Sequence, residues 1–373
     1  MSSGDASGDA GWAQLKEQAN GRERVHAGLQ VWMRGRLGDP TLTVGPLRPP
    51  AGTGVANETL LFDVARGDGA VEGYVARLAT PDPLYLDYDL SAHYRMYELM
   101  MAARSVPTPA VVGHESDPGV VGAEFFVMER IDGRVPTDNP SWGTEGFVVD
   151  AAPSQRRAMW ERTVRLLADV HLLDSAPFDF LLTNATGDGV GDCLDYWMRS
   201  LRWANPARPV PLTAEAETWL VANRPRGTAL SWGDSRLPNV LYRDYAPVGL
   251  LDWDLVSLAG PLADVAWWII MTPEEALQLD GIGSHDEFVD LWQEATGASA
   301  RDLRWFLVFG AYRLGAIVAK LFSMFVAQGR MPAEVADAQL DSGLHVRLLA
   351  GLLELAPPDG VHPHVPEVRL DRE

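Results

Sequence analysis

The feature that most constrains the fold is the separation of strand-forming from helix-forming patterns along the chain. Strand-like segments concentrate between residues 44 and 132, and helical patterns dominate from 150 to 355, with a short strand-like interruption at 239–253. Segregated strands and helices indicate an α+β architecture, because a parallel sheet built from βαβ units needs the two to alternate.

Chain length and the composition of the N-terminus set the expected domains. A chain of 373 residues exceeds the size at which one hydrophobic core usually stops growing. Residues 1–21 are mostly small and polar, so we expect a flexible tail and neither a signal peptide nor an anchor. We expect a strand-rich N-terminal lobe at 22–131 and a mainly helical C-terminal lobe at 132–373.

The strand-rich half contains a predicted hairpin. Residues 59–65 (TLLFDVA) and 71–78 (VEGYVARL) are β-compatible runs on either side of RGDGA, whose glycines favour a turn. Residues 122–133 (GAEFFVMERIDG) form the most strand-like segment. Helices are predicted over 25–37 and 89–104 from their apolar spacing.

The second half has several helix signals. Apolar residues recur at helical spacing over 154–173. Thr272–Glu275 and Ser284–Glu287 both match the capping box that begins helices. Residues 305–327 are long and apolar enough to suggest a membrane span, but an Arg and a Lys interrupt them, and a cation at the bilayer centre is costly. We therefore predict a core helix there.

Charge and cysteine content exclude some function classes. The net charge is -20, which argues against a nucleic-acid partner, because binders of phosphate backbones need clustered Lys and Arg. The one cysteine, Cys193, can form neither an internal disulfide nor a cysteine-based zinc site. We expect a cytoplasmic protein without a nucleic-acid or membrane partner, either a monomer or a homodimer.

Three oxygen-bearing side chains lie close together in LSWGDSRLPNVLYRDYAPVGLLDWD, residues 230–254. They are Asp234, Asn239 and Asp252, and they are either a divalent-metal site or ordinary loop residues. Phosphoryl transfer needs this set of side chains. One carboxylate orients the attacking hydroxyl, and an amide oxygen with a second carboxylate holds Mg²⁺ against the nucleotide phosphates.

The residues between these side chains predict that they converge. Leu237 precedes Pro238, which disfavours helix at that position, so we expect an extended loop from which Asn239 turns back. Residues 240–242 and 248–251 then predict two short strands of a hairpin. Such a hairpin returns the chain to the neighbourhood of Asn239, which favours a site over a plain loop.

SWGDSRLPN and LLDWD resemble the His-Gly-Asp-x-x-x-x-Asn loop and the Ile/Leu-Asp-Trp-Asp/Glu segment of the aminoglycoside phosphotransferase and choline kinase-like family, which shares the protein-kinase fold. In GPLADVAWW, Asp264 matches an acidic residue that braces this fold. The resemblance implies a two-lobed kinase that uses Mg²⁺ and transfers the γ-phosphate of ATP or GTP. It further implies Asp234 as the catalytic base, Asn239 and Asp252 as metal ligands, and Arg236 near the transferred phosphate.

The first half adds nucleotide-binding residues to the resemblance. YVAR resembles the family strand that presents a basic residue to the α and β phosphates, which implies Arg77. An Arg in place of the common Lys supplies a planar donor rather than a point charge. AGTGVANE would be the loop over the phosphates, with Gly54, Asn57 and Thr59 nearby.

FFVMERIDG resembles the strand that leads to the hinge between kinase lobes. The resemblance implies that the backbone of Glu129 and Ile131 contacts the adenine, with the Met128 side chain at the back of the pocket. The same segment also fits an ordinary core strand, and the two interpretations are compatible.

Two departures from the family pattern support a second hypothesis. Trp232 occupies the position of the His that supports the catalytic loop. The family pairs its basic strand residue with a helix glutamate; here His93 or Ser91 lies near that register, and Glu98 lies about a turn further on. The alternative is therefore a catalytically impaired pseudokinase that binds nucleotide or ligand without transfer.

The resemblance implies a small molecule with a hydroxyl group as the substrate. The acidic residues of 174–196 could face a cationic substrate such as an aminoglycoside, although acidic loops are usually only solvated. His171 ends an apolar helix face and is expected to be a packed core histidine rather than a base.

Overall fold

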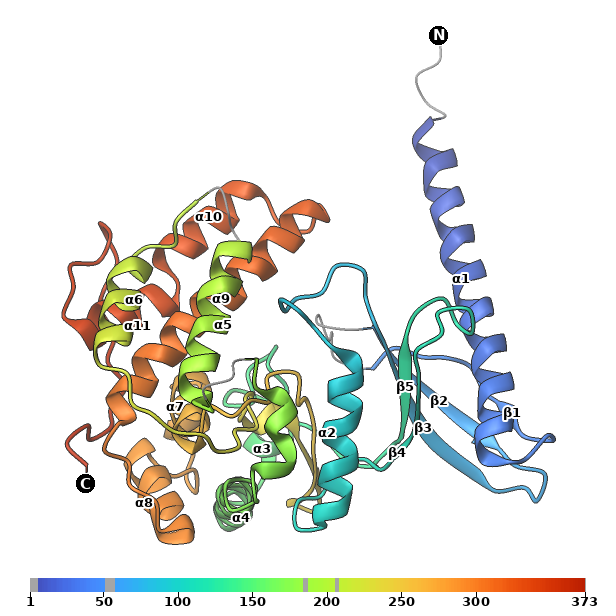
Figure 1. The fold of residues 1–373 in the computed structure, drawn as a ribbon, viewed down its shortest axis with the longest axis horizontal. Coiled ribbons are helices and arrows are strands. Elements are labelled where there is room, and N and C mark those ends of the chain that lie inside the picture. Colours follow the sequence, from blue (N-terminus) through green and yellow to red (C-terminus); the bar gives the residue numbers. More distant parts are fainter. Residues whose placement is uncertain (1–5, 51–57, 184–186, 205–207, 373) are drawn as a thin grey trace. The chain divides into compact units, whose positions relative to one another are not determined.

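The chain separates into a strand-rich unit and a helical unit, which confirms the predicted α+β segregation (Figure 1). The computed structural model describes residues 6–50, 58–183, 187–204 and 208–372, with side chains from residue 21 onward. The first unit comprises Met1–Pro83, Asp89–Glu98 and Pro109–Ile131. The second comprises Leu84–Tyr88, Leu99–Thr108 and Asp132–Glu373, so it takes in two segments that precede the boundary expected at residue 131.

The first unit is built on a five-stranded antiparallel sheet with the strand order β1-β2-β3-β5-β4. Its strands are β1 (Thr43–Val44), β2 (Glu58–Ala65), β3 (Val71–Leu78), β4 (Val111–Glu115) and β5 (Phe125–Glu129). The predicted hairpin is confirmed as β2 and β3, and the most strand-like segment is β5. The two edge strands, β1 and β4, were not expected, because such short runs carry little pattern.

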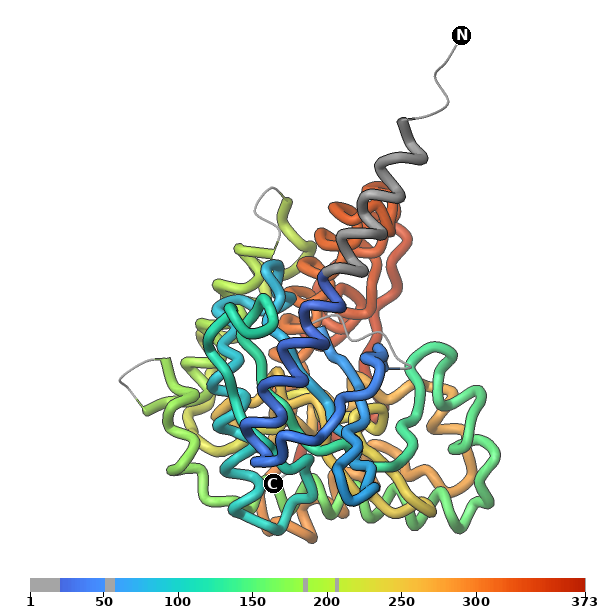
Figure 2. Tube along the Cα trace, turned by 90° about the vertical axis from the view of Figure 1, so that its right-hand side faces the viewer, coloured from blue at the N-terminus to red at the C-terminus, as the bar shows by residue number. Residues whose placement is uncertain are grey.

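Helix α1 (Ala6–Leu37) covers one face of this sheet with residues 25–37 (Figures 1 and 2). The predicted helix at 25–37 is thus the second part of a longer one, which begins at Ala6. Residues 13–19 (AQLKEQA) are all good helix formers, which favours continuation of the helix towards the N-terminus.

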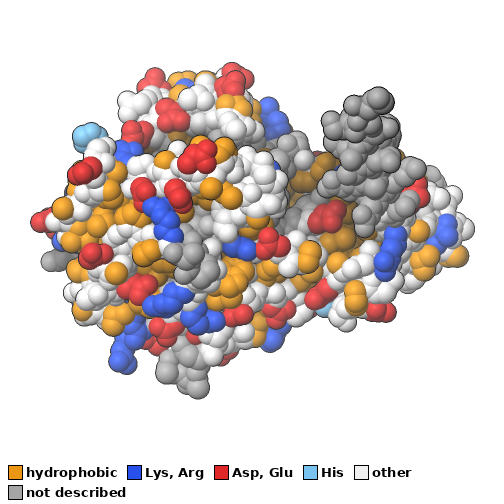
Figure 3. Space-filling model, turned by 90° about the horizontal axis from the view of Figure 1, so that it is seen from above, with side chains coloured by type: hydrophobic (Ala, Val, Ile, Leu, Met, Phe, Trp, Pro, Cys, Tyr) orange, Lys and Arg blue, Asp and Glu red, His pale blue; other side chains and the backbone are white. Residues whose placement is uncertain are grey.

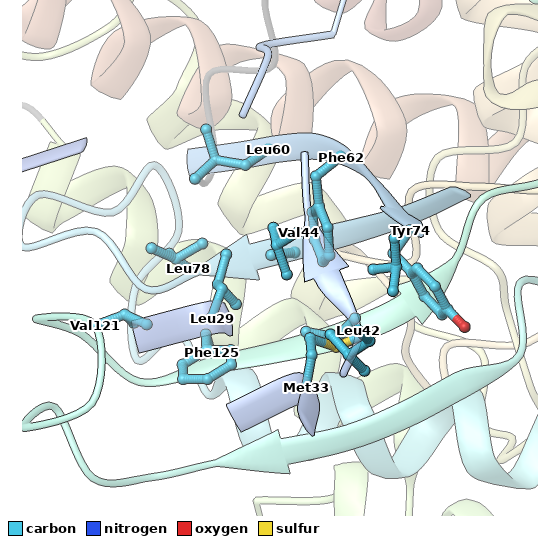
Figure 4. Close-up of a cluster of buried hydrophobic side chains, with 13 residues drawn as sticks. Leu29, Met33, Leu42, Val44, Leu60, Phe62, Tyr74, Leu78, Val121 and Phe125 are labelled. Carbon is cyan, nitrogen blue, oxygen red and sulfur yellow. The ribbon is translucent and has the colours of Figure 1, made fainter. Parts of the chain in front are cut away.

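The hydrophobic core of the first unit lies between α1 and the sheet (Figure 4). Leu29 and Met33, four residues apart on α1, are fully buried against strand side chains such as Phe62 and Phe125. The predicted apolar face of this helix is confirmed, since Trp32 and Leu37 also pack against the cluster.

Helix α2 (Leu90–Ala103) belongs to the first unit as far as Glu98. Tyr94 and Tyr97 pack their rings against Phe126 of β5, at centroid distances of 6.1 and 5.8 Å. Phe125 faces the α1 core, so Phe126, the next residue along the strand, faces the opposite side of the sheet.

The second unit is mainly helical, with one two-stranded hairpin. Its α-helices are α3 (Phe147–Asp150), α4 (Pro153–His171), α5 (Gly189–Ala204), α6 (Thr213–Ala222), α7 (Pro261–Met271), α8 (His285–Thr296), α9 (Leu303–Ala327), α10 (Ala333–Ser342) and α11 (Leu344–Leu353). The 3₁₀ turns are η1 (Ala176–Leu181), η2 (Leu237–Asn239) and η3 (Ala276–Gln278), and the hairpin strands are β6 (Val240–Arg243) and β7 (Ala246–Leu250).

Helix α9 is long and apolar enough to cross a membrane by length and composition, but 61% of its most apolar window is buried within the protein. It packs against α5, α7 and α11. Its Arg313 is only 2% exposed. These contacts fit the predicted core helix.

One of the two predicted capping boxes is confirmed. Ser284 and Glu287 exchange hydrogen bonds of 3.2 and 2.9 Å at the start of α8. The prediction at Thr272 is wrong, because Thr272 is the C-cap of α7 and its hydroxyl donates to the Trp268 carbonyl oxygen at 2.7 Å. The proline after Thr272 stops the helix there instead of beginning one.

The α1 contact provides a test of the first unit. We expect Leu29→Ala to lower the free energy of unfolding by about 2–5 kcal/mol, because it opens a cavity in the core. Val31→Ala is the matched control, since Val31 lies on the same helix but is 69% exposed. Chemical denaturation of both variants measures the difference, and equal stabilities would contradict this account of the core.

Candidate active site

The β6–β7 hairpin brings the chain back to the side of Asn239, as the sequence predicts. The Leu251 amide donates to the Asn239 carbonyl oxygen at 2.9 Å. The loop geometry differs from the prediction, because Leu237 begins the 3₁₀ turn η2 and the extended backbone lies one residue earlier, at Arg236. A tight turn, rather than an extended loop, directs Asn239 back towards Asp234.

Asp234 and Asn239 are in direct contact. The Asn239 amide nitrogen donates to Asp234 Oδ2 at 2.6 Å and to the Asp234 backbone oxygen at 3.0 Å. Both partners are acceptors, so the NH₂ group of Asn239 must face them and its Oδ1 must point elsewhere. That oxygen is therefore available to a cation.

The Asp234 carboxylate accepts hydrogen bonds from two further side chains. Trp267 donates its indole N–H to Oδ1 at 2.6 Å, and Arg236 Nε lies 3.1 and 3.0 Å from the two oxygens. Donors on both oxygens suit a charged carboxylate. Trp267 was missed in the sequence, because a Trp in an apolar helix such as α7 indicates only a core residue.

Arg236 lies beside Asp234, but its guanidinium is also bound by Asp138. Nη1 of Arg236 is 2.6 Å from Asp138 Oδ2, and the Arg236 side chain is 20% exposed. Burial alone would lower the pKa of Arg236, but the charges of Asp234 and Asp138 outweigh it and raise that pKa. No local motif marks Asp138, which is 98 residues away in the sequence.

Asp252 lies in the same region as Asp234. Burial, together with the carboxylates of Asp252, Asp234 and Asp254, raises the pKa of the Tyr85 phenol well above its usual value. Tyr88 donates to Asp254 Oδ1 at 3.5 Å. The backbone of Asp252 is in the left-handed region, with φ at 54°, which Asp tolerates better than most residues.

Asp264 of α7 holds the loop that carries Asp234. Its carboxylate accepts the backbone N–H groups of Trp232 at 2.6 Å and Gly233 at 2.7 Å. His171 Nε2 lies 2.9 Å from the same carboxylate, and its Nδ1 lies 2.9 Å from the Trp292 indole nitrogen. An indole N–H can only donate, so Nδ1 accepts and Nε2 donates to Asp264. His171 is thus the packed core histidine that we expected.

Trp232 also supports the loop through its side chain. It is fully buried, and its indole N–H donates to the Leu251 carbonyl oxygen at 2.9 Å. The side chain that replaces the family histidine therefore ties the Asp234 loop to the residue before Asp252.

The first unit holds the predicted nucleotide-binding residues that the structure describes. Thr59 lies directly opposite Arg77 across the β2–β3 pair, and Arg77 lies opposite Phe126 of β5. Cross-strand partners share a face, so these three side chains lie on the α2 side of the sheet. Gly54 and Asn57 lie outside the described residues.

The predicted hinge residues lie at the end of β5 and just after it. Met128 is buried, and Glu129 ends the strand with its N–H donating to the Ala110 carbonyl oxygen at 2.7 Å. Ile131 is the last residue of the first unit. The adenine contacts assigned to Glu129 and Ile131 stay a prediction.

The three candidate partners of Arg77 occupy different positions on α2. His93 is buried, whereas Glu98 is exposed. Burial and the neighbouring Glu98 raise the pKa of Tyr94. Ser91 donates its hydroxyl to Asp89 at the start of the helix, at 2.7 Å. Burial therefore favours His93 as the residue that faces the Arg77 side of the sheet.

The donor set suits Mg²⁺ better than a soft metal. Among the side chains that the structure describes, no three His, Cys, Asp or Glu residues group into a metal site. Mg²⁺ is usually held by one or two protein oxygens together with substrate phosphates and water. Asn239 Oδ1 and the Asp252 carboxylate fit that requirement.

Comparisons with known proteins identify the family. The family model described as the phosphotransferase enzyme family matches residues 50–298. The human protein named acyl-CoA dehydrogenase family member 11 is 26% identical over 312 residues, which is 77% of this chain and 37% of that protein. The chain thus spans little more than a third of the length of this curated relative.

Solved structures share the fold. A Ralstonia eutropha protein with a proposed aminoglycoside phosphotransferase activity superposes with a TM-score of 0.61 at 21% identity, covering 83% of this chain and 92% of that one. The aminoglycoside phosphotransferase APH(4)-Ia, in a complex with ADP and hygromycin B, gives 0.51 at 15% identity, covering 85% and 97%. The two-lobed kinase-like fold expected from the sequence is confirmed.

Gly233 provides a test of the loop geometry. Its φ is +97°, and a Cβ there would overlap the Leu255 carbonyl oxygen. Gly260 has a similar φ of +91° with open space around it. We expect Gly260→Ala to cost about 1–3 kcal/mol from backbone strain alone, and Gly233→Ala to cost about 1–3 kcal/mol more from the overlap. Thermal and chemical unfolding of both variants measure the difference, and equal costs would contradict the close approach.

Proposed function

Because this chain belongs to the phosphotransferase enzyme family, we propose that it is a small-molecule kinase that transfers the γ-phosphate of ATP or GTP to a substrate hydroxyl. The observation that carries the proposal is the hydrogen-bonded pair of Asp234 and Asn239 on a loop fixed by Asp264. Catalysis of phosphoryl transfer depends mainly on such positioning and on charge stabilisation.

In the proposed reaction, the acceptor oxygen attacks the γ-phosphorus while the bond to the β-phosphate bridging oxygen breaks. The nucleoside diphosphate leaves, and the acceptor proton passes to Asp234 as the catalytic base. Arg236 supplies a cation for the charge on the transferred phosphoryl group. To reach that group, its guanidinium exchanges Asp138 for a phosphate oxygen.

We propose Asn239 and Asp252 as the metal ligands. These two residues would hold Mg²⁺ beside the nucleotide phosphates, where the ion would supply positive charge against the charge that develops during transfer. The Asn239 Oδ1, which points away from Asp234, and the carboxylate of the half-buried Asp252 supply the hard oxygen ligands that this cation prefers.

We propose that the first unit binds the nucleotide. Arg77 would contact the α and β phosphates, with Thr59 next to it in the sheet. Gly54 and Asn57 would lie over the phosphates.

We propose that the hinge segment of the first unit binds the adenine through its backbone. Because the Glu129 N–H already donates to Ala110, an adenine contact at Glu129 would use its carbonyl oxygen, with the Ile131 N–H as the second contact. Met128 would lie at the back of the pocket.

We propose a hydroxyl-bearing small molecule as the substrate, and a cytoplasmic protein that acts as a monomer or homodimer without nucleic-acid or membrane partners. On the face in Figure 3, acidic and basic side chains are interspersed rather than gathered by sign. The net charge of -20 disfavours a polyanionic partner and is compatible with a cationic substrate.

The second candidate function is a pseudokinase that binds nucleotide without transfer. This candidate is supported by the position where the family has a glutamate that pairs with the basic strand residue. Of the three possible partners of Arg77 on α2, the buried one is His93. The other reason, Trp232, is weakened by the hydrogen bond through which it supports the loop. A pseudokinase would show thermal stabilisation by nucleotide and metal without release of ADP.

Removal of the base tests the proposed chemistry. We expect Asp234→Asn to lower kcat by about 10²–10⁴-fold, because the acceptor hydroxyl loses its proton acceptor. Asp244→Asn is the control, since Asp244 is exposed in the hairpin turn and Asn tolerates its φ of +50°. ADP release is measured against a panel of acceptors that includes hygromycin B and hydroxylated acyl-CoA thioesters, suggested by the names of the relatives.

Full turnover by Asp234→Asn would contradict the assigned base. Nucleotide binding by the unmodified protein without turnover on a broad panel would favour the pseudokinase.

Removal of the metal tests the second part of the proposal. We expect EDTA to abolish ADP release and the thermal stabilisation by ATP, and Mg²⁺ to restore both, because the nucleotide phosphates need the cation held by Asn239 and Asp252. Asp252→Asn should raise the Mg²⁺ concentration needed for half-maximal turnover. Turnover that is unaffected by EDTA would rule out the metal site.

A further inference from the structure

Three side chains donate hydrogen bonds to Asp234, and two of them have a further role in the proposed reaction. Asn239 is a proposed metal ligand, and Arg236 is a proposed phosphate contact. Binding of the nucleotide would therefore draw Arg236 towards phosphate, and Asn239 would carry the metal through its Oδ1 while its NH₂ group faces Asp234. Trp267 is the third donor, and no ligand of the proposed reaction competes for its indole N–H.

Trp267 is held rigidly. It is 3% exposed, it lies in the interior of α7, and its indole nitrogen is 2.6 Å from Asp234 Oδ1. An indole carries one N–H and no acceptor, so this side chain can occupy Oδ1 only as a donor. Oδ2 accepts from Asn239 and Arg236, so movement of Arg236 to phosphate would leave room at Oδ2 for an incoming hydroxyl.

The guanidinium of Arg313, on α9, stacks on the ring of Trp267. Its guanidinium carbon lies 3.7 Å from the Trp267 ring centroid, and its Nη2 donates to the Gly233 carbonyl oxygen at 2.6 Å. Arg313 is 2% exposed. The planar guanidinium thus contacts both the indole and the backbone residue directly before Asp234.

We propose that Trp267, clamped by Arg313, is a positioning residue that fixes the Asp234 carboxylate for the attack of the acceptor hydroxyl. The inference rests on the proposed function in that Asp234 is taken as the base. Arg236 can then turn to the transferred phosphate without releasing the carboxylate.

The contact itself is tested by NMR of the full chain, without any turnover. The protein has 13 tryptophans, and Trp267→Phe identifies the indole N–H signal of Trp267 by its loss. We expect Asp234→Ala to move that signal upfield, because the hydrogen-bond acceptor is gone. Asp252→Ala should leave it in place. An unmoved signal in Asp234→Ala would overturn the proposal.

The positioning role is tested by kinetics. We expect Trp267→Phe to lower kcat by about 10- to 100-fold, as a misplaced catalytic group does, with the KM for ATP within twofold of the unmodified protein. Trp268→Phe is the matched control, because Trp268 is the next residue of α7, is 2% exposed and stacks on Phe288 instead. It removes the same volume and should retain kcat.

Arg313→Lys distinguishes the effect of guanidinium stacking on Trp267 from the effect of the positive charge. Lysine keeps the charge but cannot stack on the indole, so we expect a loss of kcat close to that of Trp267→Phe. Retention of kcat by Trp267→Phe, or equal losses in Trp267→Phe and Trp268→Phe per folded molecule, would overturn the positioning role. If the unmodified protein shows no turnover, the proposed function fails, while the NMR signal still decides whether Trp267 holds Asp234.

Discussion

The hydrogen bonds between the Asp264 carboxylate and the backbone of Trp232 and Gly233 are the interaction on which the site depends. A fully buried carboxylate is costly unless its lone pairs are satisfied. Here two backbone N–H groups and the His171 imidazole satisfy them. The loop before Asp234 therefore cannot move away without leaving a buried charge unpaired, and this penalty keeps Asp234 in one place.

Helix α7 supplies two of the groups that hold the loop. Asp264 and Trp267 are three residues apart, so they lie on the same side of the helix. Asp264 binds the loop backbone, and Trp267 binds the Asp234 side chain. One helix thus sets both the path of the loop and the direction of the Asp234 carboxylate. Helix α9 adds Arg313, which contacts the Trp267 ring and the Gly233 carbonyl oxygen.

The parts of this protein that could be predicted are those with local patterns. The β2–β3 hairpin, β5 and the hairpin after Asn239 were all evident in apolar runs and turn residues. The capping box at Thr272 failed because the same four letters also fit a helix end followed by proline. The loop at Leu237 failed because the residue before a proline can still begin a 3₁₀ turn.

The sequence by itself determined the segregated α+β order and the spacing of Asp234, Asn239 and Asp252, since these depend on neighbouring residues. The tertiary structure alone decided which distant side chains surround the base. Trp267, Asp138 and Arg313 reach the loop from 33, 98 and 80 residues away, to Asp234, Arg236 and Gly233 respectively. No local pattern encodes such contacts, because they arise only when separate helices and turns pack around the loop.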